Sequence, residues 1–281
     1  MYIDTHSHLN FNAYRDDADE VIKRALDEDV QMIIASANYK SSKKALEIAN
    51  KYLQGVNVAV GLHPTNLEDV IEKYDGKEIL VSAEEFNIDI YQQLAKFKKV
   101  VAIGEIGLDY YRSDLHKDMN FVKEQQKKVF LAQLNLALNL ELPVIIHCRD
   151  AHDDMLTILT KFKSDHAEEL PKDRPWGVMH CFSGNEDLAW KYFNLGLIIS
   201  FTGVITFSKQ WDDLIRKVPN DKLMIETDCP FMTPEPYRGK RNEPVLVKYV
   251  AKRIAEIKGI TMEEVGEATT ENAKKLFSLI D

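Results

Sequence analysis

The sequence predicts a (β/α)8 barrel of the TIM type, and two features of the chain favour this fold. The first is the length of 281 residues, which is close to the roughly 250 residues typical of such barrels. The second is an alternation of short apolar, β-branched runs with longer segments of helical periodicity, which is typical of parallel strands joined by helices. An open, doubly wound sheet is the alternative, and the number of runs favours the barrel.

Each predicted strand is a short segment rich in aliphatic residues. In chain order the runs are Met1–Thr5, Gln31–Ala35, Val56–Val60, Val100–Gly104, Pro143–Ile146, Trp176–Met179, Leu197–Phe201 and Lys222–Ile225. The nearly continuous apolar character of the fourth and fifth runs suits strands that are buried on both faces. Between these two runs, apolar residues recur at helical spacing over Phe121–Leu140. No repeat or linker interrupts the pattern, so we expect one domain over residues 1–281.

The composition limits the cellular setting and the partners that we expect. No apolar run reaches the roughly 20 residues that span a bilayer, and the first residues do not resemble a signal peptide. Three cysteines imply no disulfide framework, so we expect a cytoplasmic protein without membrane contact or an obligate protein partner. The net charge of −9 argues against extended binding along nucleic acid. A nucleic-acid substrate would be held locally, at an end or over a few nucleotides.

Side chains suited to metal binding follow six of the predicted strands. In a parallel barrel the carboxyl ends of all strands open onto one face, where the active sites of barrels are built. Any one of these residues could equally be a hydrogen-bonded histidine or a capping carboxylate, but their convergence favours a metal centre. The residues are His6 and His8 after the first run, His63 after the third, Glu105 after the fourth, His147 after the fifth, His180 after the sixth and Asp228 after the eighth.

The ligand types and their number predict two divalent ions. Imidazole and carboxylate without thiolate are typical of Zn, Mn, Co, Ni or Fe sites, and in part of Mg sites. His6 and His8 lie two positions apart in an extended segment, so both rings point to the same face and can reach one ion. Four imidazoles and two carboxylates exceed one tetrahedral site and suffice for two ions that share a bridging carboxylate and a water molecule. Asp228 could bind an ion and also accept the proton of that water.

The cysteines stand directly beside three of the proposed ligands. They are Cys148, Cys181 and Cys229. Alternation along an extended segment turns neighbouring side chains to opposite faces. We therefore expect the three thiols to be small buried packing groups that point away from the ions.

Eight segments, taken in order, resemble the TatD family of metal-dependent hydrolases. They are DTHSHLNF, VGLHP, IGEIGLDYYR, LPVIIHCRDA, HCFSG, ETDCP, YRGKRNEP and TTENAKKLF, and the resemblance runs from Tyr2 to about Phe277. The family is related to the amidohydrolases and is generally described as deoxyribonucleases. The resemblance therefore implies a metal-dependent hydrolase that acts on ester bonds and cleaves the phosphodiesters of DNA, from an end.

The resemblance also implies a division of the metal ligands between two sites. His6, His8, Glu105 and Asp228 would hold one ion. The second ion would be held by His147 and His180, with Glu105 bridging the two. Glu105 and Asp228 are then the expected catalytic carboxylates. The metal, which could be Zn, Mg, Mn, Ni or Co, is not determined by the sequence.

The substrate contacts are less firmly indicated. His63 in the GLHP segment resembles the substrate-side histidine of the family, although Thr65 and Asn66 follow where many members carry another histidine or an acidic residue. The planar guanidinium of Arg149 could pair with a phosphate oxygen. The loop Pro234–Pro244 could hold a terminal phosphate and stack a base, or it could be a solvated loop. Its candidate side chains are Tyr237, Arg238, Lys240 and Arg241. The polar stretch Lys163–Arg174 has no role that the sequence indicates.

Two other functions stay open on the sequence alone. The same ions could hydrolyse an ester or amide, for example as an aminoacyl-tRNA deacylase, although Arg149 and the basic loop favour phosphate. A non-catalytic binding protein stabilised by metal is the third possibility. Closed structural metal sites lack an open position, whereas six ligands shared between two ions leave room for water.

Overall fold

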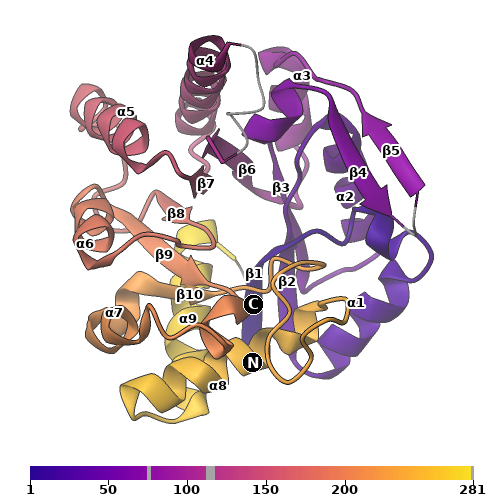
Figure 1. Cartoon of the computed structure of the whole chain (residues 1–281), viewed down its shortest axis with the longest axis vertical. Helices are drawn as coiled ribbons and strands as arrows, with labels where there is room; N and C mark the ends of the chain where they lie inside the picture. The colour runs from indigo at the N-terminus through magenta and orange to yellow at the C-terminus, as the bar shows by residue number, and fades with distance from the viewer. Residues whose placement is uncertain (75–76, 112–117, 280–281) are drawn as a thin grey trace.

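The eight predicted strands form one parallel sheet that curls into a nearly closed barrel (Figure 1). The computed structural model describes residues 1–74, 77–111 and 118–279. Neighbouring strands pair in the order β1-β2-β3-β6-β7-β8-β9-β10, and a parallel bridge between Ser7 and Cys229 links the last strand end to the first. The predicted barrel is therefore confirmed. The strands are β1 (Tyr2–Ser7), β2 (Val30–Ile34), β3 (Val56–Val60), β6 (Val100–Asp109), β7 (Val144–Arg149), β8 (Gly177–Met179), β9 (Leu197–Phe201) and β10 (Leu223–Ile225).

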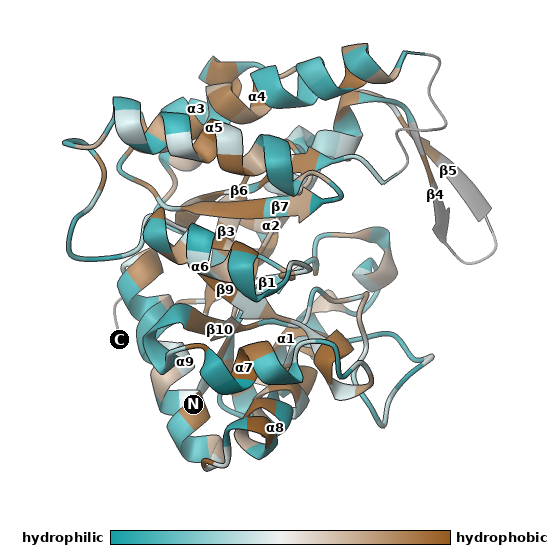
Figure 2. Ribbon diagram, turned by 60° about the vertical axis from the view of Figure 1, so that its left-hand side comes forward, coloured by the Kyte–Doolittle hydropathy of each residue, from teal (hydrophilic) through white to brown (hydrophobic). Residues whose placement is uncertain are grey.

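The helices surround this barrel and alternate with its strands along the chain. Figure 2 shows β6, β7 and β10 as mostly hydrophobic and the surrounding helices as mixed, as expected for strands buried on both faces. In the described part of the chain, no helix has both the length and the hydrophobicity needed to cross a membrane. The helices are α1 (Ala18–Asp27), α2 (Tyr39–Ala49), α3 (Ile88–Ala95), α4 (Met119–Asn139), α5 (His152–Asp165), α6 (Glu186–Asn194), α7 (Asp212–Lys217), α8 (Val247–Lys258) and α9 (Met262–Phe277), with short 3-10 turns at η1 (Asn12–Tyr14), η2 (Pro64–Leu67), η4 (Gly203–Thr206), η5 (Asn220–Lys222) and η6 (Pro244–Leu246).

Helix α9 closes one end of the barrel. Its residues Ala273, Leu276 and Phe277 pack in one buried cluster with a single residue from each strand of the barrel. On β1, β3, β6, β7, β8 and β10 these residues precede the predicted site residue of the strand, so they fill the barrel on the side of α9. The carboxyl ends of the strands are left for the functional site, as in other barrels. The strand residues are Ile3, Ile33, Ala59, Ala102, Ile145, Val178, Ile198 and Met224.

Two parts of the fold differ from the simple alternation. An antiparallel hairpin, β4 (Val70–Tyr74) and β5 (Lys77–Val81), lies outside the ring of eight strands and was not expected (Figure 1). The stretch Lys163–Arg174 begins in the last residues of α5 and, with the segments before β8, β9 and β10, lines a cavity of about 670 Å³. These segments precede their strands, so this cavity lies at the end of the barrel away from the strand carboxyl ends.

Candidate metal centre

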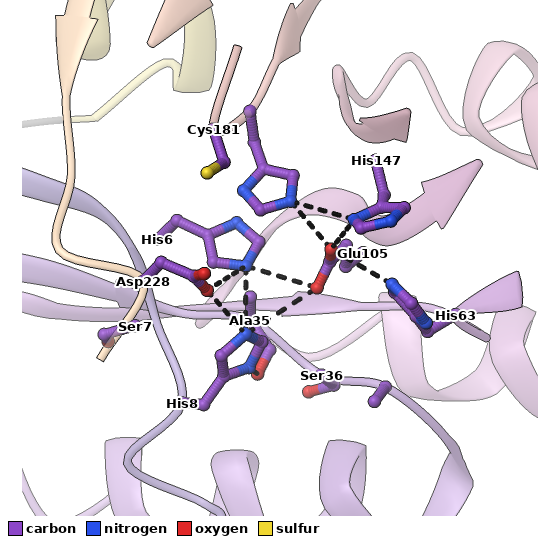
Figure 3. Close-up of polar contacts among 12 residues, drawn as sticks. His6, Ser7, His8, Ala35, Ser36, His63, Glu105, His147, Cys181 and Asp228 are labelled. Carbon is purple, nitrogen blue, oxygen red and sulfur yellow. Dashed lines mark hydrogen bonds and ion pairs between the residues drawn. The ribbon is translucent and has the colours of Figure 1, made fainter. Parts of the chain in front are cut away.

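The carboxyl ends of the strands bring the predicted ligands together. His6 lies in β1 and His8 directly follows that strand, while Glu105 and His147 lie in β6 and β7. His180 is the first residue after β8, and Asp228 is the third residue after β10. All six side chains meet within one group of contacts, although the residues are spread over most of the chain. Figure 3 labels five of them, His6, His8, Glu105, His147 and Asp228.

Glu105 stands at the centre of this group, and its two oxygens face different partners (Figure 3). Oε2 lies 3.3 Å from Nε2 of His6 and 3.7 Å from Nε2 of His8. Oε1 lies 2.8 Å from Nδ1 of His147 and 2.8 Å from Nε2 of His180. The carboxylate therefore separates two ligand clusters and belongs to both, which is the arrangement expected of a bridge between two cations.

The first cluster is completed by Asp228. Its Oδ1 lies 3.2 Å from Nε2 of His8 and 3.8 Å from Nε2 of His6, and the two ring nitrogens lie 3.1 Å apart. Two imidazole nitrogens and two carboxylate oxygens thus point at one small space among buried side chains. Such a set of nitrogen and oxygen lone pairs fits a divalent cation of the transition-metal type.

The second cluster contains a third imidazole besides His147 and His180. Nδ1 of His147 lies 3.3 Å from Nε2 of His180, and Nε2 of His63 lies 3.3 Å from the same Glu105 oxygen that these rings face. His63 is thus close enough to bind an ion as well as to meet a substrate. Its predicted role on the substrate side stays a prediction.

A third grouping of potential ligands, His6, His180 and Glu226, is better explained by hydrogen bonding. The rings of His6 and His180 are stacked, with centroids 3.9 Å apart and planes inclined by 12°. The lone pairs of an imidazole lie in the ring plane, so two parallel rings do not converge on one ion. Glu226 instead accepts from Nδ1 of His180 at 3.2 Å, which directs Nε2 of that ring toward Glu105.

Two carboxylates that the sequence reasoning missed orient the ligand rings. Asp109 lies 3.0 Å from Nε2 of His147, and buried Glu226 holds His180 while also accepting from the backbone N–H of Cys181 at 2.6 Å. Partners of this kind fix ring orientation and raise the basicity of a ligand. Strand alternation could have revealed Asp109, since it lies four residues after Glu105 on the same face of β6.

The electrostatics of the group match a site built for cations. Burial disfavours the charge on Glu105, yet nearby His180, His63 and His6 bring its pKa well below the usual value. Burial likewise disfavours a proton on His180, but the charges of Glu105 and Glu226 raise the pKa of this ring well above its usual value. A proton on His180 thus balances the ionised carboxylates, and a divalent ion can take its place when the ring loses it.

Replacing Asp109 by asparagine is expected to weaken metal binding in the second cluster by roughly 10–100-fold. Asparagine can still accept from the Tyr111 N–H, as Oδ1 does now at 3.0 Å, so the backbone should be retained. The variant loses the negative charge that faces His147. Calorimetric titration with Zn²⁺ or Co²⁺ measures the change, with exposed Asp27→Asn as a matched control. Unchanged affinity at both positions would mean that other groups orient His147.

A cavity of about 630 Å³ opens directly above the two clusters. One side of it is polar and includes His63, Asn66 and Arg149. The other side, formed by segments that follow β9 and β10, is largely apolar and includes Trp211 and Phe231. A substrate in the cavity would therefore have both ion positions beneath it and walls of different character on either side.

The predicted substrate-binding residues are placed unequally with respect to this cavity. Arg149 lines it, and its guanidinium carbon lies 3.5 Å from the centre of the Tyr111 ring. The side chains of the loop Pro234–Pro244 are not among the described residues that line it. Their binding roles stay predictions.

Side chains of this loop make contacts of their own. The guanidinium of Arg241 donates to Asp17 Oδ1 at 2.9 Å and also pairs with Glu243. Arg238 stacks on the Phe207 ring at 3.5 Å, whereas the hydroxyl groups of Tyr237 and Tyr249 lie 3.0 Å apart. The ammonium of Lys240 lies 5.6 Å from the Tyr237 ring. Arg241 is thus held by carboxylates, which leaves Arg238 and Lys240 as the loop cations with the fewest ionic contacts among the described residues.

The cysteines follow the expectation only in part. None of them belongs to a ligand grouping in the described part of the chain, and Cys148 and Cys229 are buried. Cys148 nevertheless lines the cavity, and so does Cys181, which is only half-buried. Its φ of 43° shows that the backbone has left the extended conformation after β8, so strand alternation does not hold at this residue.

Comparisons with known proteins agree with the fold and with a metal-dependent hydrolase. The family model described as TatD related DNase matches residues 3–278. The uncharacterized metal-dependent hydrolase YabD of Bacillus subtilis is 41% identical over 99% of this chain and 100% of its own length. The 3'-5' ssDNA/RNA exonuclease TatD of Shigella flexneri is 32% identical over 96% of each chain. The crystal structure of the TatD homolog YJJV from Escherichia coli matches with a TM-score of 0.81 and 28% identity, covering 99% of this chain and 98% of that one. The chain therefore belongs to the TatD-related DNase family of metal-dependent hydrolases.

Proposed function

We propose that this chain is a nuclease that uses two divalent ions to hydrolyse phosphodiester bonds, removing nucleotides from the 3' end of single-stranded DNA. The observation that carries the proposal is the position of Glu105 between two ligand clusters at the floor of one cavity. Relatives named 3'-5' ssDNA/RNA exonuclease support the substrate class and the direction. RNA is the second substrate that these names suggest.

The ions, when bound, would polarise the phosphoryl group and lower the pKa of a water molecule beside them. His6, His8 and Asp228 would hold one ion and His147 and His180 the other, with Glu105 in contact with both. This set of donor atoms does not determine which metal binds, because it suits Zn, Mn, Co or Ni and in part Mg.

Asp228 is the residue that we propose as the proton acceptor. Burial raises the pKa of a carboxylate, but the hydrogen bond to His8 and the charges of His8 and His6 lower that of Asp228. An ionised carboxylate at the cavity floor can take the proton of an attacking water molecule. On the polar wall, Arg149 would hold a non-bridging phosphate oxygen through its planar fork.

The size and closure of the cavity favour action at an end. A volume of about 630 Å³ lies within the roughly 300–1,000 Å³ of small-molecule pockets, so it suits a nucleotide and not a duplex. The far end of the barrel is filled by α9 and the strand residues packed against it. A DNA strand that enters the cavity thus has no continuous path through the barrel. We therefore expect the end of the DNA strand to reach the ions.

An ester or amide hydrolase, such as an aminoacyl-tRNA deacylase, is the second candidate. The apolar wall with Trp211 and Phe231 could accept an acyl side chain as well as a base. Metal-activated water can attack either a carbonyl or a phosphorus centre, so the ligands do not separate these reactions. A non-catalytic role is disfavoured, because the ligand clusters lie beneath an open cavity and are not enclosed.

Cleavage ladders of labelled oligonucleotides test the proposal. Metal-loaded protein is expected to shorten single-stranded DNA stepwise from the 3' end, and excess EDTA should abolish the reaction. Label at the 5' end reveals the ladder, while label at the 3' end is released as mononucleotide. An aminoacyl ester of tRNA is the comparison substrate. Hydrolysis of that ester with DNA and RNA left intact would reject the nuclease and favour the second candidate.

A further inference from the structure

We propose that Phe231 and Phe11, whose rings both lie next to the His8 ring, form with Met232 a subsite on which the base of the terminal nucleotide stacks. We refer to these three residues as the base platform. The proposal rests on the proposed nuclease function and adds the part of the substrate that the cavity recognises. It also predicts that recognition depends little on which base is present.

The base platform lies next to the first ligand cluster. The ring of Phe11 stacks on the ring of His8, with centroids 4.3 Å apart and planes inclined by 15°. The ring of Phe231 lies 6.4 Å from the same His8 ring at a steeper angle. A phosphate held above this cluster therefore has aromatic surface within the reach of the nucleoside attached to it.

Phe231 is exposed although hydrogen bonds hold its backbone. It is 51% exposed and lines the cavity. Its N–H donates to the carbonyl of Asp228 at 2.9 Å, which ties the residue to the ligand turn. The side-chain amide of buried Asn242 donates to the carbonyl of Phe231 at 2.6 Å and to that of Thr227 at 2.9 Å.

The backbone of Met232 is held by a close contact with η4. The backbone of Gly203 in η4 approaches the Met232 carbonyl so closely that a Cβ at this glycine would collide with it. Met232 itself has a φ of 52° and is 40% exposed. A backbone that is already fixed reduces the freedom that such residues lose when a ligand covers them. This favours a binding surface over a chance exposure.

The surrounding wall suits a flat ring without base-specific polar contacts. Beside the base platform the cavity is lined by Val204, Ile205 and Trp211, whereas charged groups such as Arg149 lie on the other wall. Every nucleobase has a π-face that stacks on aromatic side chains, so stacking tolerates any sequence. The geometry thus assigns phosphate and base to opposite walls, with the scissile bond above the ions.

An oligonucleotide with 2-aminopurine as its 3'-terminal base tests the base platform, because the fluorescence of this base is quenched when it stacks. Wild-type protein is expected to quench it, and to cleave a base-bearing 3' end about tenfold more efficiently than an abasic end, mainly through KM. Phe231→Ala should lose the quenching and this preference, and Phe231→Trp should restore both. Phe97→Ala serves as the matched control, since Phe97 is 50% exposed and lies before β6, away from the cavity.

Two results would overturn the base platform. The first is that Phe231→Ala quenches the fluorescence as much as wild type does. The second is that Phe231→Ala loses cleavage equally on base-bearing and abasic ends. The proposed nuclease would stand in both cases. Conversely, quenching that depends on Phe231 without any cleavage would reject the nuclease and support the subsite. Circular dichroism of each variant verifies that the fold is retained.

Discussion

Replacing Asp228 by asparagine is expected to lower kcat for oligonucleotide cleavage by roughly 10²–10⁴-fold, the range associated with loss of a positioned acid or base. The carboxylate lies 3.2 Å from His8 Nε2 and belongs to the first ligand cluster, so one substitution removes a metal ligand and the proposed proton acceptor. Asparagine has nearly the same shape and tolerates the positive φ of 54° found at this residue. The measurement is a single-turnover cleavage assay at saturating metal.

Asp150→Asn is the matched control for this variant. Asp150 is exposed, has a similar φ of 53°, and lies at the same end of the barrel directly after β7. The same change of charge and shape there should leave kcat within a factor of a few. If the two variants retain equal activity, Asp228 is neither a required ligand nor the proton acceptor, and the proposed chemistry is wrong.

The strands could be predicted from the sequence because a parallel barrel buries both faces of each strand. The predicted runs Val56–Val60 and Leu197–Phe201 coincide with β3 and β9. β6 extends further than the predicted run, to Asp109, because Gly107–Asp109 pair with His147–Arg149 of β7. Pairing with a neighbouring strand, and not apolar character, determines where β6 ends.

The hairpin was missed although the sequence contains a signal for it. The dipeptide Asp-Gly stands between the segments of β4 and β5, and this dipeptide is a strong hairpin signal when it is flanked by alternating residues. The alternation of strands with helices does not indicate an additional hairpin in the connection that follows β3. The turn dipeptide is therefore the signal in the sequence that indicates the hairpin.

The grouping of the ligands could be predicted because it depends only on strand ends. The partners of those ligands could not all be predicted in this way. The side-chain amide of Asn242 donates to the carbonyls of Thr227 and Phe231, which lie 15 and 11 positions earlier in the chain. No periodic pattern in the sequence indicates these contacts. Arg241 was proposed to bind substrate from its charge, yet its carboxylate partner Asp17 lies 224 positions away in the sequence. Charge shows that a side chain can bind an anion, whereas the tertiary fold determines which anion is present.

Replacing Glu105 by glutamine is expected to reduce the bound metal from the two ions that we propose per chain to one or none, and to lower kcat by at least as much as Asp228→Asn. Both carboxylate oxygens face ligand rings now, Oε2 toward His6 and Oε1 toward His147 and His180. An amide offers only one acceptor oxygen and places an N–H₂ donor toward the other cluster. Metal analysis after gel filtration, together with the cleavage assay, measures both effects. Glu85→Gln, which makes the same chemical change at an exposed position outside the ligand clusters, is the matched control.

Comparison with single-cluster variants shows whether Glu105 truly connects the two positions. His8→Ala removes a ligand from the first cluster alone and His180→Ala from the second alone, so each should weaken one ion and retain part of the other. A carboxylate that binds both ions predicts that Glu105→Gln weakens both at once, by more than either histidine variant. If Glu105→Gln instead loses the same single ion as one of them, the carboxylate serves only that cluster. The second oxygen would then be a hydrogen-bond acceptor, and catalysis would have to proceed with one ion and the proton acceptor Asp228.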